Sequence, residues 1–271
     1  MRSHIAIGLT ALVATCFCRT DVAAEPRKVS SDINVTVYAE RLNGPRGLLI
    51  TKEGKLYAVE QSGGTLVRIE GNRTIRHANG FAEPHDVAID FEGNFLVADT
   101  GNNRVARVVA SGAVNTYIRD LKTPVDLAFN AAGELLICEY SAQRVTVFTA
   151  SNKRRLFVSG FAPHGLAFGP GDLTLINDLS NNRIVAFKAD GTGTPLASNI
   201  DTPIGLAIGP SGDIYVPESK AGKLYRIRRD GTRALLLEGL ARPRDPAFDS
   251  HGNLYLAETD GGRVLKITGR F

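Results

Sequence analysis

Short apolar stretches alternate with glycine-rich turns along most of the chain. Residues 86–90, 95–98, 104–109 and 114–118 each have the length of a strand, and turn residues separate them. Gly93 stands where a tight turn needs a positive φ. No stretch keeps a helical period over the roughly ten residues that a helix needs. The pattern predicts an all-β protein built from four-stranded antiparallel units.

The unit recurs six times. Prolines mark it at spacings of 39 or 40 residues: Pro45, Pro84, Pro124, Pro163, Pro203 and Pro243. An acid follows each proline fifteen positions later: Glu60, Asp99, Glu139, Asp178, Glu218 and Glu258. A four-stranded sheet of this length cannot bury both faces alone, whereas radial repetition packs each sheet on its neighbours. The repeat therefore predicts a six-bladed β-propeller over residues 25–271.

The two ends of the repeat predict how the ring closes. The sixth unit stops after its third strand, at residues 263–268. Residues 33–38 precede the first proline and are typical of a strand, but they have no partner in their own unit. We expect this N-terminal strand to complete the last blade, because an open array would leave two exposed sheet edges.

Residues 1–24 have the pattern of a secretory signal peptide. Arg2 and His4 precede an apolar run at residues 5–18, and small residues allow cleavage after Ala24. The apolar run is shorter than the roughly 20 residues of a membrane-spanning helix. A retained N-terminal anchor is the alternative. We expect an exported protein, periplasmic or extracellular, with no membrane span in the mature chain.

Composition narrows the class of partner. The 32 Lys and Arg residues exceed the 28 Asp and Glu residues by only four, without blocks of like charge, which argues against a nucleic-acid partner. After residues 1–24, Cys138 is the one remaining cysteine, and its apolar neighbours predict a buried residue. No phosphate-binding glycine loop is present, and we expect no organic cofactor. We predict a monomer whose partner is a small-molecule ligand or another protein.

Two segments resemble the signature of the NHL repeat. They are residues 98–105 (Ala-Asp-Thr-Gly-Asn-Asn-Arg-Val) and 177–184 (Asn-Asp-Leu-Ser-Asn-Asn-Arg-Ile). The resemblance extends over all six units and implies a six-bladed propeller with a central channel. It implies little about function, because propellers of this kind serve as binding platforms, sensors and enzymes.

The position after each repeat proline is the candidate site. It is occupied by Arg46, His85, Val125, His164, Ile204 and Arg244. The innermost strands of a propeller line its channel, so these residues form a ring. Imidazole carries protons and ligates zinc, and paired guanidinium groups bind carboxylate or phosphate. The candidate catalytic residues are therefore His85, His164, Arg46 and Arg244.

Pro84-His85-Asp86 and Pro163-His164-Gly165 resemble the Pro-His motifs of peptidyl-amidating lyases. In that family three such histidines on alternate blades hold a catalytic zinc. The third alternate blade here carries Arg244, which cannot ligate zinc, so Asp86 or Asp245 would have to supply the missing ligand. The resemblance implies one divalent metal (zinc, calcium or magnesium) on His85, His164, Asp86 and Asp245.

The sequence also resembles two further types of propeller. In virginiamycin B lyases a Pro-His histidine works with an acid at the end of the second strand around magnesium, which corresponds here to His85 with Asp99 and His164 with Asp178. In gluconolactonases, carboxylates bind a divalent metal at the channel mouth. Asp86, Asp126 and Asp245 stand near that position, and Asp126 is a further candidate binding residue.

The six acids that follow the repeat prolines, which we call the acidic column, have a spacing that favours a structural role. In five of the six units Arg or Lys stands five positions after the acid, a spacing that brings the two ends of a tight hairpin together. A ring of carboxylates that binds calcium is the alternative. Glu60 lacks a basic partner because Thr65 occupies that position, and it is therefore another candidate binding residue at the channel mouth.

Two functions remain open from the sequence. The first is an exported propeller that binds a small, anionic ligand or a protein partner at the mouth of its central channel. The alternative is a divalent-metal-dependent lyase or lactonase-type hydrolase with its site in that channel. A stoichiometric metal that depends on His85 and His164 would distinguish the enzyme from the binding protein.

Overall fold

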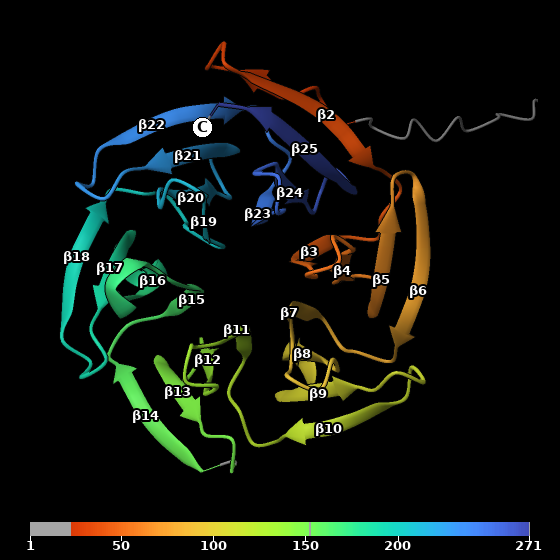
Figure 1. Ribbon diagram of the computed structural model, residues 1–271, viewed down its shortest axis with the longest axis vertical. Coiled ribbons are helices and arrows are strands. Elements are labelled where there is room, and N and C mark those ends of the chain that lie inside the picture. Colours follow the sequence, from red (N-terminus) through yellow and green to blue (C-terminus); the bar gives the residue numbers. More distant parts are fainter. Residues whose placement is uncertain (1–22, 152, 271) are drawn as a thin grey trace, which may run out of the picture.

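The computed structural model describes residues 23–151 and 153–270. They form six antiparallel sheets around a central axis, so the predicted six-bladed β-propeller is confirmed (Figure 1). The helical elements among them are three single 3-10 turns, Thr100–Asn102, Pro170–Asp172 and Leu179–Asn181. No helix of this part of the chain is long and apolar enough to cross a membrane. Residues 1–22 of the predicted signal peptide lie outside the described residues.

Each blade has the predicted strand order, and the innermost strand starts at or near the repeat proline. Blades 1 and 2 consist of β3 (Pro45–Ile50), β4 (Leu56–Glu60), β5 (Thr65–Glu70), β6 (Arg73–Asn79), β7 (Pro84–Ile89), β8 (Phe95–Asp99), β9 (Arg104–Val108) and β10 (Val114–Ile118). Blades 3 and 4 consist of β11 (Pro124–Phe129), β12 (Leu135–Glu139), β13 (Arg144–Phe148), β14 (Arg154–Ser159), β15 (Pro163–Phe168), β16 (Thr174–Asp178), β17 (Arg183–Phe187) and β18 (Gly193–Ser198). Blade 5 consists of β19 (Ala207–Ile208), β20 (Ile214–Glu218), β21 (Lys223–Ile227) and β22 (Arg233–Glu238).

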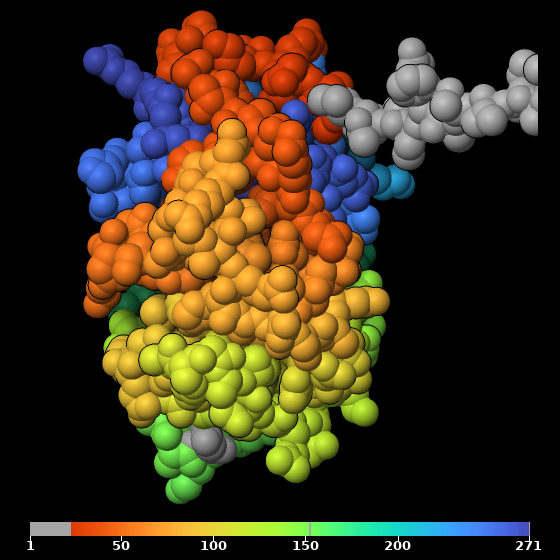
Figure 2. Space-filling view, turned by 90° about the vertical axis from the view of Figure 1, so that its right-hand side faces the viewer, coloured from red at the N-terminus to blue at the C-terminus, as the bar shows by residue number. Residues whose placement is uncertain are grey.

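Blade 6 confirms the predicted closure by the N-terminal strand. Its own strands are β23 (Pro243–Phe248), β24 (Leu254–Glu258) and β25 (Arg263–Gly269), and β2 (Ile33–Ala39) pairs antiparallel with β25. The two strands lie side by side at the top of Figure 1, and Figure 2 shows the red N-terminal residues packed against blue C-terminal ones. A further strand, β1 (Arg27–Lys28), pairs with β22 and was not predicted.

The hydrophobic core is divided among the interfaces between blades. Between blades 2 and 3, Leu96 and Val105 pack in one cluster with Leu127 and Ile137, and each is at most 2% exposed. Full burial of each such side chain contributes about 1.5–3 kcal/mol to stability. A corresponding cluster lies between blades 6 and 1, so packing as well as strand pairing closes the ring.

Cys138 is buried, as the sequence predicted. The side chain is a free thiol, and it lies in the cluster between blades 3 and 4. Burial raises the pKa of the thiol well above its ordinary value, so it stays protonated and packs as an apolar group.

The acidic column fastens the hairpin of most blades, as predicted. In blade 2, Arg104 Nε donates to Asp99 Oδ2 at 2.6 Å, and the backbone N–H of Ala82 donates to Oδ1 at 2.7 Å. The corresponding pairs in blades 3, 4 and 6 are Glu139–Arg144, Asp178–Arg183 and Glu258–Arg263. Blade 5 departs from the prediction, because Arg233 of the outer strand, rather than Lys223, lies 3.9 Å from Glu218.

Candidate functional site

A β-bulge after the repeat proline positions the residues of the predicted ring. In blade 1 the ladder passes from the Pro45–Glu60 pair to the Leu48–Ala58 pair, so the inner strand carries one extra residue. The same shift occurs in blades 2, 4 and 6. A bulge bends a strand and redirects the side chains that it contains. These four bulges carry Arg46, His85, His164 and Arg244.

These four side chains, which we call the channel cluster, come together from distant parts of the sequence. Arg46 Nη2 lies 3.4 Å from His164 Nε2, and the His85 and His164 rings stack with centroids 6.1 Å apart. Arg244 is close enough to lower the pKa of the other three side chains. Each residue is at most 9% exposed, so the cluster is a nearly dry layer across the channel.

Both histidines of the cluster are neutral. Desolvation is the main cause that lowers the pKa of His85 and His164, and the positive charges of Arg46 and Arg244 add to it. A neutral imidazole has one nitrogen that accepts a hydrogen bond. His164 Nε2 therefore accepts from the Arg46 guanidinium, whereas Nδ1 of His85 is buried and has no partner among the described residues.

The two arginines of the cluster remain charged at neutral pH. Burial, together with the charges of neighbouring guanidinium groups, lowers the pKa of Arg46 to about 9 and that of Arg244 to about 10. Among the described residues neither arginine forms an ion pair with a carboxylate, and Nε of Arg244 is buried without a partner. The cluster thus holds excess positive charge in a desolvated place, where an anion would be stabilised.

Asp245 is the carboxyl group that most affects these arginines. Burial raises its pKa to about 7, against the opposing effect of Arg46 and Arg244. Gly205 on blade 5 leaves room for this side chain, because a Cβ atom at Gly205 would collide with Asp245 Oδ1. Asp245 is therefore only partly ionised at neutral pH and compensates the arginines incompletely.

Asp86 and Asp126 connect adjacent blades. Asp86 Oδ2 accepts from the backbone N–H of Leu127 at 3.1 Å, and Asp126 Oδ2 accepts from that of Leu166 at 3.2 Å. Burial raises the pKa of both carboxyl groups well above the ordinary value, and the nearby carboxyl groups raise it further. Both side chains are thus positioned as interblade hydrogen-bond acceptors.

Two residues near the cluster were missed at the sequence level. The Tyr140 ring centroid lies 6.3 Å from that of His164, and Tyr140 is 38% exposed, so its phenol connects the cluster with the surface. Asn177 is fully buried, and its Nδ2 donates to the carbonyl groups of Ile204 and Gly205 at 3.1 Å each. The residue directly after each acid of the acidic column differs from unit to unit, and Tyr140 holds this position in the third unit. This variable position was the signal that could have indicated Tyr140.

A cavity of about 450 Å³, which we call the anion cavity, opens beside Arg244. The side chains that matter for its chemistry are Thr202, Ser219, Lys220, Arg242, Arg244 and Asp260. Asp260 lies 3.2 Å from Arg242, which leaves Lys220 and Arg244 as further positive groups beside two hydroxyl groups. Thr202 and Arg242 directly precede repeat prolines and have positive φ angles, as Glu83 and Thr123 do in their own blades, so this conformation belongs to the repeat and does not mark the cavity.

The predicted metal ligands do not form a shared coordination sphere. Among the described residues, no three His, Cys, Asp or Glu side chains gather in a metal-binding arrangement. The His85 and His164 rings stack instead of converging, and Nε2 of His164 faces a guanidinium group. These residues do not fit a catalytic metal, and we derive no step through one.

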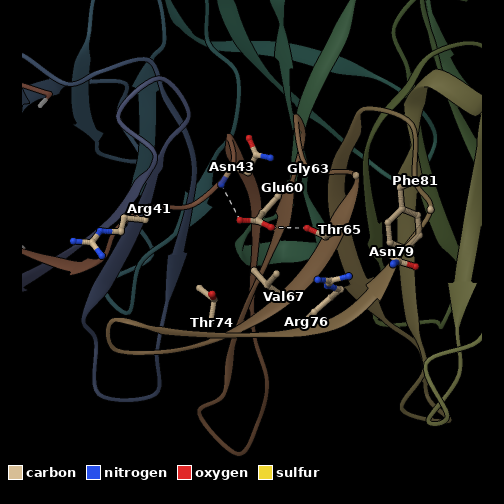
Figure 3. Close-up of a pocket in the computed structure, with 12 residues that line it drawn as sticks. Arg41, Asn43, Glu60, Gly63, Thr65, Val67, Thr74, Arg76, Asn79 and Phe81 are labelled. Atoms are coloured by element: carbon tan, nitrogen blue, oxygen red, sulfur yellow. Dashed lines mark hydrogen bonds between the residues drawn. The ribbon is translucent and has the colours of Figure 1, made fainter. Parts of the chain in front are cut away.

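Glu60 lies apart from the channel cluster. It lines a separate cavity of about 830 Å³ that blade 1 and its flanking loops form (Figure 3). The residues proposed from the sequence thus divide among three places: the channel cluster with Asp245, the interblade contacts of Asp86 and Asp126, and the cavity at Glu60.

Comparison with known families supports the repeat assignment. The family model of the NHL repeat matches residues 81–107, which include the segment that resembles its signature. Blade 2 is an NHL repeat. A comparison with curated protein sequences finds no match.

Solved structures share the fold of this six-bladed propeller. A gluconolactonase from Xanthomonas campestris has a TM-score of 0.79 over 90% of this chain and 95% of its own, at 15% identity. A luciferin-regenerating enzyme reaches 0.75 over 88% and 95%, also at 15% identity. Virginiamycin B lyase from Staphylococcus aureus reaches 0.66 over 87% and 98%, again at 15% identity. At these identities the likeness establishes the fold alone.

Proposed function

We propose that this NHL-repeat propeller binds a small anionic ligand at the channel mouth, with Arg244 at the junction of the anion cavity and the channel cluster. The observation that carries the proposal is the state of Arg244. Its side chain is charged and 5% exposed, its Nε has no partner in the part of the chain that the structure describes, and it lines a cavity. A buried charge without a counter-charge is costly, and a bound anion would supply that counter-charge.

The surrounding groups favour a carboxylate or phosphate group. Arg244 offers a planar fork that binds two oxygen atoms at once. Lys220 adds a positive charge, and the hydroxyl group of Ser219 adds a donor on the same cavity wall, whereas the Thr202 hydroxyl already donates to Asp201. The charges of Arg46 and Arg244 interact, and Arg46 forms no ion pair with a carboxylate among the described residues, so it adds to the positive potential.

Calorimetric titration with sulfate, inorganic phosphate and gluconate tests this function. We expect saturable binding of at least one of these anions and a loss of about 10- to 100-fold in affinity in Arg244→Ala. Arg244→Lys should have intermediate affinity, because it keeps the charge but loses the fork. The exposed Arg119→Ala is the matched control and should bind as the unmodified protein does. Equal affinity of Arg244→Ala and the unmodified protein would refute the proposal.

A second candidate function is catalysis at the same place. It is favoured by neutral His85, whose buried Nδ1 is free beside two guanidinium groups. A neutral imidazole can accept a hydrogen bond from a bound substrate and orient it, and the guanidinium groups can stabilise the negative charge that develops. This arrangement is compatible with lyase or lactonase chemistry, the classes named for two proteins of similar fold.

Turnover separates the two candidates. If the protein is an enzyme, His85→Ala should retain anion binding but lose lactone hydrolysis or elimination in a substrate screen. Binding without turnover in the unmodified protein would leave ligand binding as the function.

A further inference from the structure

The cavity at Glu60 has chemistry of its own. No residue of the channel cluster lines it, and its polar side chains come from Arg41, Asn43, Glu60, Thr65, Thr74, Arg76 and Asn79. Figure 3 shows Glu60 between Asn43 and Thr65, with both hydrogen bonds of its carboxylate drawn. We call this space the blade 1 cavity.

The blade 1 cavity lies where other blades place an arginine side chain. In blades 2, 3 and 4 the residue five positions after the acid is arginine, and its Nε donates to the acid. The distances are 2.6 Å for Arg104–Asp99, 2.8 Å for Arg144–Glu139 and 2.8 Å for Arg183–Asp178. In blade 1 this position is Thr65, whose short side chain reaches Glu60 but leaves the space beyond it empty.

The missing arginine leaves Glu60 partly open to solvent. The paired acids Asp99, Glu139 and Asp178 are fully buried, whereas Glu60 is partly exposed at the cavity wall. The backbone N–H of Asn43 donates to Oε1 at 2.8 Å, and the Thr65 hydroxyl donates to Oε2. These bonds orient the carboxylate, and each of its oxygen atoms can accept a further hydrogen bond.

A carboxylate of this column can hold more than one guanidinium group. Glu139 accepts from Arg144 and also from Arg154, at 2.8 and 2.9 Å. Arg41 and Arg76 on the cavity wall are exposed and form no ion pair among the described residues, so neither neutralises the Glu60 carboxylate.

We propose that the blade 1 cavity binds a guanidinium group from outside the chain, on Glu60, in the place of the arginine that blade 1 lacks. The guanidinium fork matches a carboxylate in geometry and charge, as the pairs in the other blades show. The group belongs to a free guanidinium compound or to an arginine side chain of a partner peptide.

Titration of the full chain with agmatine, followed by NMR or calorimetry, tests the proposal. We expect saturable binding in the unmodified protein and a loss of at least about tenfold in Glu60→Gln. Thr65→Arg supplies the guanidinium group within the chain, so it should raise the melting temperature and abolish agmatine binding. Arg76→Ala should bind agmatine at least as tightly as the unmodified protein does, because it removes a nearby positive charge.

Thr65→Arg keeps the test independent of misfolding, since a more stable protein that no longer binds agmatine has lost the site alone. Agmatine binding that persists in Thr65→Arg, or the lack of saturable binding to the unmodified protein, would overturn the proposal. The tripeptide Gly-Arg-Gly distinguishes the sources: tighter binding than agmatine indicates a partner peptide, and weaker binding indicates a free compound. Sulfate binding should be the same in Thr65→Arg and the unmodified protein, which separates this site from the channel mouth.

Discussion

Arg46 of blade 1 donates a hydrogen bond to Nε2 of His164 on blade 4, over a distance of 3.4 Å. The two blades stand opposite each other, so this contact bridges the channel. It also occupies the nitrogen lone pair through which His164 would bind a metal or accept a proton. His85, whose Nδ1 has no partner within residues 23–151 and 153–270, is therefore the histidine of the pair that can contact a ligand.

Replacement of Arg46 by Ala should raise the pKa of His164. The Arg46 charge is one cause of the low pKa, but desolvation is the larger one, so the pKa should remain below 6.5. NMR titration of the imidazole proton signals measures the shift. Arg46→Lys keeps the positive charge and should show a smaller change. A His164 signal with the same titration in all three proteins would contradict this electrostatic coupling.

Affinity for an anion should fall as the pH rises through about 7. Below this pH Asp245 is protonated and neutral, whereas above it the carboxylate offsets the charges of Arg46 and Arg244 and repels the ligand. A second fall should follow near pH 9, where Arg46 begins to lose its proton. Both histidines stay neutral over this range, because their pKa values lie well below it.

Sulfate is a suitable probe for this pH dependence, since its own charge is constant over the range. Calorimetry across the pH series should show both falls in the unmodified protein and only the upper one in Asp245→Asn. A fall at pH 7 that survives in Asp245→Asn would rule out Asp245 as its origin.

Gly205→Ala should destabilise the fold and displace Asp245. The added methyl group would collide with Asp245 Oδ1, and overpacking of this kind costs about 1–3 kcal/mol of unfolding free energy. Urea unfolding measures the loss. Gly169→Ala is the control, because its Cβ would meet the Leu175 side chain at an ordinary contact of 3.4 Å. Equal stability of the two variants would argue against the close approach at Gly205.

Ile33→Ala should weaken the closure of the ring. Ile33 starts β2, is 2% exposed and packs into the cluster between blades 5 and 6. Its truncation should lower the free energy of unfolding by about 2–5 kcal/mol. Asn34→Ala on the exposed face of the same strand should change it by no more than about 0.5 kcal/mol. Similar values for both variants in urea unfolding would show that the strand does not stabilise the ring through its buried face.

The fold was predictable because its signals are local and repeated. The prolines, turn glycines and acidic column recur in one register, and each refers to residues close in sequence, such as Asp99 and Arg104. The missing fourth strand of the last blade and the unpaired segment before Pro45 together predicted the pairing of β2 with β25. The strand β1 was missed, because two residues carry too little pattern to predict a pairing.

The sequence by itself determined the ring of blades and which residues occupy its bulges, since both follow from periodicity. Only the tertiary structure decided what those residues contact. Asp86, Asp126 and Asp245 hold the same repeat position, yet two bond the backbone of the next blade and the third affects Arg46 and Arg244. The reason is physical: hydrogen bonds across a ring and the desolvation of a charge depend on which blades face each other in space, and no local pattern records this.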